Sequence, residues 1–79
     1  MNKTSLIMAP RGNLRVVGLG ALGEMEVARL QEFGFYNGAP LTKLSHGVNG
    51  ITVNSFGAKV AITRALASNI VVEEADGDS

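Results

Sequence analysis

Residues 39–63 read "APLTKLSHGVNGITVNSFGAKVAIT", and this stretch decides the fold class. Within it, "ITVNSF" and "AKVAIT" carry apolar side chains at strand spacing, and "APLTKLS" carries Leu41 and Leu44 around Thr42 and Lys43. The glycines of "HGVNG" and "FG" separate the three runs. Short runs joined by glycine turns are typical of antiparallel strands and leave no room for long parallel crossovers. The second half of the chain is therefore predicted to form three β-strands connected by tight turns.

The flanking residues extend this pattern to a mainly β fold. A first strand is predicted at 13–19 ("NLRVVGL"), one helical turn at 64–69 ("RALASN") and a last strand at 70–74 ("IVVEE"). About five short strands in so small a chain suit a small, partly open β-barrel that closes on itself to protect its edges.

One short α-helix is predicted after the first strand, at 24–33 ("EMEVARLQEF"). Its spacing places Val27, Leu30 and Phe33 on one side, the expected core stripe. Gly34 follows where a left-handed residue ends a helix, and Phe35 stands where a Schellman motif packs an apolar residue against Leu30. The chain is expected to reverse at this point.

The glycines of "VVGLGALGEME" (16–26) spell G-x-G-x-x-G between the predicted strand and helix, which is the spacing of a dinucleotide-binding turn. Such a site needs an acidic residue roughly 20 positions later to hold the ribose hydroxyls. Residues 38–43 contain none, and no Asp or Glu occurs anywhere from Phe33 to Val72. We therefore interpret the motif as a flexible connection and expect no cofactor.

Composition narrows the function classes further. The 79 residues suffice for one domain, and they include seven basic and seven acidic residues and no cysteine. The apolar run Leu6–Ala9 is too short for a signal peptide or a membrane span, so a cytoplasmic location is predicted.

His46, the one histidine, has no cysteine or carboxylate close to it in sequence, so no metal site is expected. The basic residues are scattered and the aromatic residues few, which argues against nucleic acid as a partner.

Three stretches resemble the ferrous iron transport protein A (FeoA) family. They are "SLIMAPRGNLRVVGL", "RLQEFGFYNG" and "AKVAITRALASNIVVE", and together they run from Ser5 to Glu73. The chain departs from the family pattern at Asn37, where the family usually has proline, and at Phe33 and Phe35, which replace aliphatic residues.

The resemblance implies an SH3-like β-barrel and a single domain over 1–73, followed by an acidic disordered tail over 74–79. It also implies a small cytoplasmic accessory that acts by binding FeoB, the membrane transporter of ferrous iron with a GTP-binding domain, and not by catalysis. Recruitment to the inner face of the cell membrane would follow from that binding, without insertion into the membrane. Weak self-association stays open. The alternative is the SH3-like domain found in iron-dependent transcriptional repressors.

Four residues are candidates for the partner-binding surface. Leu22 and Met25 lie off the predicted core stripe and next to the glycines, while Arg29 and Tyr36 are of the types that dominate interfaces. Gly34 and Gly38 are predicted to be structural turn residues, and no catalytic or metal-binding residue is predicted.

Overall fold

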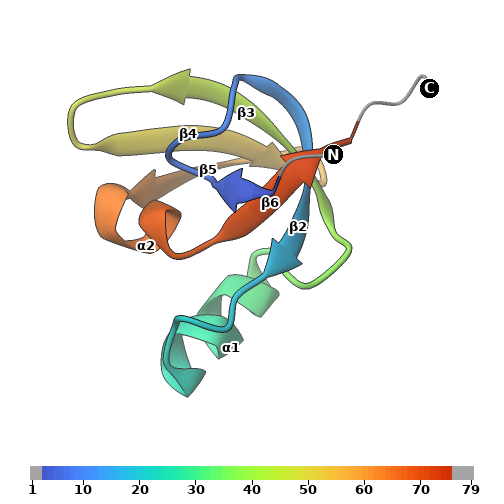
Figure 1. Ribbon diagram of the computed structural model, residues 1–79, viewed down its shortest axis with the longest axis vertical. Coiled ribbons are helices and arrows are strands. Elements are labelled where there is room, and N and C mark those ends of the chain that lie inside the picture. The colour runs from blue at the N-terminus through green and yellow to red at the C-terminus, as the bar shows by residue number, and fades with distance from the viewer. Residues whose placement is uncertain (1–2, 76–79) are drawn as a thin grey trace.

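The computed structural model, which describes residues 3–75, is built on one antiparallel sheet of six strands (Figure 1). The strands lie in the order β1-β6-β2-β3-β4-β5. The elements, in chain order, are β1 (Thr4–Ser5), β2 (Gly12–Gly18), α1 (Glu24–Glu32), β3 (Pro40–His46), β4 (Gly50–Ser55), β5 (Ala58–Thr63), α2 (Arg64–Ser68) and β6 (Val71–Glu74).

The mainly β prediction is confirmed, with a sixth strand, β1, of only two residues. The strand order has two ends, β1 and β5, so backbone pairing within residues 3–75 does not close the sheet into the barrel that the sequence suggested. Strand β6 extends to Glu74, which pairs with Leu14, and the Ala75 N–H donates a hydrogen bond of 3.1 Å to the Asn13 carbonyl. The sheet therefore continues past the boundary predicted at residue 73, and 76–79 of the expected tail lie outside the described residues.

Helix α1 ends in a Schellman motif. The Phe35 N–H donates to the Leu30 carbonyl at 2.9 Å, the Gly34 N–H donates to the Gln31 carbonyl at 3.0 Å, and Gly34 has φ +94°. These two bonds satisfy carbonyls that the end of a helix would otherwise leave without donors. The chain then turns back, and the Phe35 side chain enters the core.

The core lies on one face of the sheet and includes Leu30 of α1 and Ala67 of α2. Its largest fully buried side chains are Phe35, Leu6, Leu14, Ile70, Val16, Val53 and Val72. The predicted helical stripe is wrong in part, because only Leu30 of α1 is buried, Val27 is half-buried and Phe33 is 50% exposed. Phe33 is the C-cap residue, and the reversal after it turns Phe35 inward in its place.

Strand β3 also departs from the apolar pattern of its sequence. Leu41 and Lys43 face the interior, and Leu44 is exposed, because successive side chains of a strand point to opposite faces. The Lys43 ammonium donates hydrogen bonds to the carbonyls of Leu6 (3.0 Å), Ile7 (3.2 Å) and Ala9 (2.7 Å). A buried lysine thus ties the segment after β1 to the middle of the sheet.

The turn before β3 is built around Gly38. The Ala39 N–H donates to the Tyr36 carbonyl at 2.9 Å, and Gly38, the third residue of this turn, has φ +92°. This is the conformation that a type II turn requires at that position. The Gly38 N–H donates to the Val16 carbonyl at 2.7 Å, which fixes the turn beside β2.

Candidate partner-binding groove

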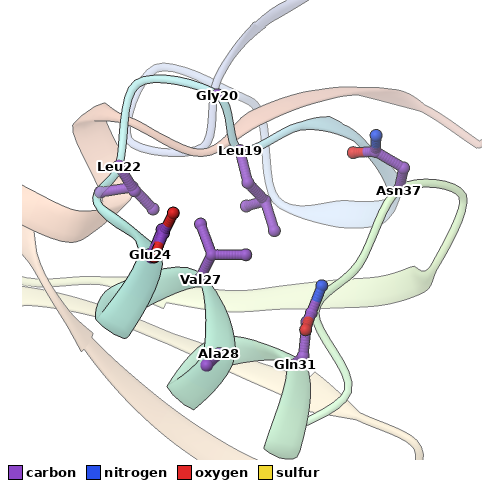
Figure 2. A pocket seen from close by; sticks show the side chains of 8 residues that line it. All are labelled: Leu19, Gly20, Leu22, Glu24, Val27, Ala28, Gln31 and Asn37. Atoms are coloured by element: carbon purple, nitrogen blue, oxygen red, sulfur yellow. The ribbon is translucent and has the colours of Figure 1, made fainter.

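A groove of about 470 Å³ lies between α1 and the connection that leads into it. In Figure 2 the side chains of Leu19, Leu22 and Val27 converge to form its apolar wall. The full lining is Leu19, Gly20, Leu22, Glu24, Val27, Ala28, Gln31 and Asn37. Three separate segments contribute to it: residues 19–24, the following turns of α1, and the turn before β3.

The connection from β2 to α1 positions the apolar wall. The pairing of β2 with β6 shifts register between Val16 and Gly18, and the strand ends there. The Leu22 N–H then donates to the Leu19 carbonyl at 3.1 Å, which curls residues 19–22 into a turn. This turn brings Leu19 and Leu22 to the same side, opposite Val27 (Figure 2).

The N-terminus of α1 carries negative side chains. Gly23 is the N-cap residue, and its N–H donates to the Glu26 carboxylate at 3.0 Å, while Glu24 lies in the same first turn. Carboxylates are favourable at this end of a helix because of the helix dipole, and they disfavour the approach of a phosphate. The glycine motif thus ends at a helix start already occupied by a carboxylate of its own chain.

Most of α1 is accessible to a partner. Figure 1 shows the helix at one end of the molecule, below the strands. Leu30 is its one buried residue, and Met25 is 79% exposed. A short helix of this kind can offer its surface to another protein without uncovering the core of the sheet.

The structure separates the four candidate residues. Leu22 is half-buried and lines the groove, whereas Met25 and Arg29 are exposed on α1 and do not line it. Tyr36 lies outside the groove, where its ring stacks on that of Phe56 with 6.3 Å between the centroids and 17° between the planes. The groove itself contains Leu22 alone of the four.

Sequence reasoning missed Phe56, whose exposed ring stacks on that of Tyr36. Phe56 is 64% exposed and has φ +51°, a conformation that is rare for a bulky side chain. It lies in the two-residue turn between Ser55 and Ala58, which pair across β4 and β5. The sequence "SFGA" could have predicted this exposure. A residue in a two-residue turn lies at the end of the hairpin, so its side chain is held away from the centre of the sheet.

Metal-ligating side chains do not gather in the described part of the chain. Within residues 3–75 no group of three or more His, Cys, Asp or Glu side chains could hold a metal ion. The His46 ring is exposed, and its Nδ1 lies 3.4 Å from the Lys43 ammonium.

Burial of the Lys43 side chain lowers the pKa of its ammonium from the ordinary value of 10.5, and the positive charge of Arg11 lowers it further.

No helix in the described part of the chain is both long and apolar enough to span a bilayer.

Solved structures of similar fold include two FeoA proteins. A crystal structure of an iron uptake regulatory protein (FeoA) superposes with a TM-score of 0.80 and 24% identity, covering 91% of this chain and 97% of that one. The solution structure of the FeoA protein from Chlorobium tepidum gives a TM-score of 0.83 and 26% identity, covering 96% and 74%.

Two further solved structures share the same fold over part of their length. The manganese regulator SloR gives a TM-score of 0.79 and 19% identity, covering 90% of this chain and 34% of the SloR chain. The crystal structure of ScaR with bound Zn²⁺ gives a TM-score of 0.81 and 16% identity, covering 90% of this chain and 36% of the ScaR chain. These likenesses agree with the SH3-like fold expected from the sequence. No curated relative matches the chain.

The family model described as the FeoA domain matches residues 6–74. The match covers all of the strands except β1, both helices and the whole groove. The chain therefore belongs to the FeoA family.

Proposed function

We propose that this protein is a cytoplasmic accessory of ferrous iron uptake that binds the FeoB transporter and catalyses no reaction itself. The observation that carries the proposal is the FeoA-domain match over residues 6–74, since membership of this family supports an accessory role in ferrous iron transport. The exposed helix and its apolar groove supply a surface on which such binding could take place.

The groove fits an apolar side chain of the partner. Its wall of Leu19, Leu22 and Val27 would surround that side chain, in the way that the buried centre of an interface is apolar. Met25 lies beyond the groove on the exposed surface of α1, and the flexible methionine side chain adapts to the shape of a partner. Glu24 lies at the edge of the groove and would favour a basic partner residue next to the apolar anchor.

A pull-down of the cytoplasmic GTP-binding domain of the transporter tests this function. The domain is presented without nucleotide, with GDP and with a non-hydrolysable GTP analogue. We expect the wild-type chain to bind in at least one of these states, and Leu22→Glu and Met25→Glu to weaken binding about tenfold or more.

Val48→Glu is the matched control. Val48 is an apolar residue that is 85% exposed in the connection between β3 and β4, and it does not line the groove. It should bind as the wild type does. Failure of the wild type to bind in all three nucleotide states would contradict the function, whereas equal binding by all variants would contradict only the surface.

The second candidate function is that of an SH3-like domain in a metal-dependent transcriptional regulator. The likeness to the manganese regulator SloR over 90% of this chain favours it. Since the matched part is only 34% of SloR, the natural protein would then be more than twice as long as this chain. An antibody blot of the source cells distinguishes the two: a band close to 8.2 kDa supports the transport accessory, and a much larger band supports the regulator.

A further inference from the structure

Strand β5 is an open edge of the sheet. It is the last strand in the order, and its one paired neighbour is β4. Alternate residues of an antiparallel strand direct their N–H and C=O groups toward and away from the neighbour. Ser55 and Ala58 flank the two-residue turn and form a hydrogen-bonded pair, so Val60 and Ile62 also bond to β4.

Lys59 and Ala61 consequently direct their backbone groups outward. Both residues are exposed, and neither backbone N–H donates a hydrogen bond to another turn or loop of residues 3–75. The other end of the sheet offers no comparable edge, because β1 has two residues. An edge of free donors and acceptors is a template for another strand.

We propose that β5 pairs with β5 of a second copy of this chain, antiparallel, about a two-fold axis at Ala61. This register places Ala61 opposite Ala61 of the second copy, so the outward N–H and C=O of each can bond to those of the other. It also places Lys59 opposite Thr63, and Val60 opposite Ile62. The strand is thus complementary to itself, which is what a two-fold interface requires.

Charge and backbone direction select this register over its neighbours. An axis at Lys59 would set two lysines directly opposite each other, and like charges in that position are destabilising. An axis at Val60 would join fewer free groups, because it sets Lys59 opposite Ala61 but Thr63 opposite Gly57, which lies in the hairpin turn. An axis at Thr63 would collide with α2, which begins at Arg64. The Ala61 register pairs the outward groups of Lys59, Ala61 and Thr63 without repulsion, and it therefore joins the most free groups.

The pairing would stop at two copies and does not involve the groove. Once the β5 edges are joined, the outer edges of the dimer are the two-residue β1 strands, which limits further addition. No residue of β5 lines the groove between α1 and its connection. The inference therefore does not rest on the proposed binding of the transporter.

Sedimentation equilibrium with charge variants at the axis tests the proposal. The wild type should show a monomer–dimer equilibrium, and Ala61→Lys and Ala61→Glu, each alone, should raise the dissociation constant about tenfold or more at low salt, since like charges then face each other. An equal mixture of the two variants should restore the dimer. Unchanged circular dichroism and melting of each variant would show that the exposed substitution leaves the fold intact.

Amide hydrogen exchange supplies a second readout on the wild type. Protection of the Lys59 and Ala61 amides should increase with protein concentration, while the Val60 amide, bonded to β4, serves as an internal reference. A wild type that stays monomeric up to about 1 mM overturns the proposal, as does a dimer that both variants retain unchanged. A dimer abolished by either charge but not restored by the mixture also overturns it.

Discussion

Gly34 is required by both conformation and space. Its φ of +94° lies in the left-handed region, which costs an L-residue roughly 1–2 kcal/mol. A Cβ atom at this position would lie 2.6 Å from the Ser55 hydroxyl and 2.8 Å from Cδ2 of the Phe56 ring. The Ser55 hydroxyl donates a hydrogen bond of 2.8 Å to the Phe33 carbonyl, so displacing it would also disturb the end of α1.

We expect Gly34→Ala to lower the free energy of unfolding by about 2 kcal/mol or more, the sum of the left-handed penalty and the steric displacement. Chemical denaturation measures the change. Gly20→Ala is the matched control, because Gly20 has no atom within 4 Å of its would-be Cβ and no positive φ. Equal midpoints for the two variants would contradict the assignment.

Lys43 stabilises the fold through its hydrogen bonds and not through an ion pair. It is 2% exposed, and its three carbonyl acceptors all belong to the segment of residues 6–9. Replacing it by methionine keeps most of the volume but leaves these carbonyls without their donor. We expect Lys43→Met to lower the free energy of unfolding by about 2–4 kcal/mol at neutral pH, measured by denaturation.

The same residue predicts a dependence on pH. Because burial lowers the pKa of Lys43 below 10.5 in the folded state, the unfolded chain binds more protons between the lowered pKa and 10.5. Stability from this group therefore rises with pH across that window. The wild-type unfolding free energy, minus that of Lys43→Met, should increase as the pH approaches 10.5. A constant or falling difference would contradict a lowered pKa.

At the scale of elements, the sequence predicted what local chemistry determines. The strands at 40–46, 50–55 and 58–63 follow from their turns, and the end of α1 follows from the order Leu30, Gly34, Phe35. The sequence could not predict that Phe33 would be exposed or that Lys43 would be buried. Both depend on which side of an element meets the core, and tertiary packing decides that.

The turn before β3 allows a further test. Asn37 occupies the second position of this type II turn, where proline is favoured, and its N–H donates no hydrogen bond to a residue between 3 and 75. Asn37→Pro should therefore raise the free energy of unfolding by about 0.4–1 kcal/mol, because it restricts the unfolded chain. Thermal denaturation measures this, with Asn37→Ala as the control for loss of the side chain. A lower melting temperature than that of Asn37→Ala would contradict the turn assignment.

For the whole molecule, the groove could be anticipated only in part. Leu22 was recognisable because it lies off the helical stripe, but Asn37 and Gln31 reach the groove through the turn at Gly38 and the direction of α1. No local sequence pattern predicts that Asn37 and Gln31 line the same groove. The open edge at β5 was hidden for the same reason, since it depends on which strands pair across the sheet.

The position of α1 predicts that stability is unevenly distributed. The helix has nine residues, one of them buried, and isolated helices of that length are marginal in water. Strand β4, by contrast, lies between β3 and β5 and contributes Ile51 and Val53 to the core. Opening α1 should therefore expose little apolar surface, while opening β4 should require unfolding of the sheet.

Native-state hydrogen exchange in low concentrations of denaturant tests this difference. Amides of α1 should exchange about tenfold or more faster than those of β4, with little dependence on denaturant, whereas β4 amides should follow global unfolding. Equal exchange free energies and equal denaturant slopes would show instead that α1 and the sheet unfold together. Because α1 forms one wall of the groove, a partner seated there would hold the helix closed, and the α1 amides should then slow toward the rate of β4.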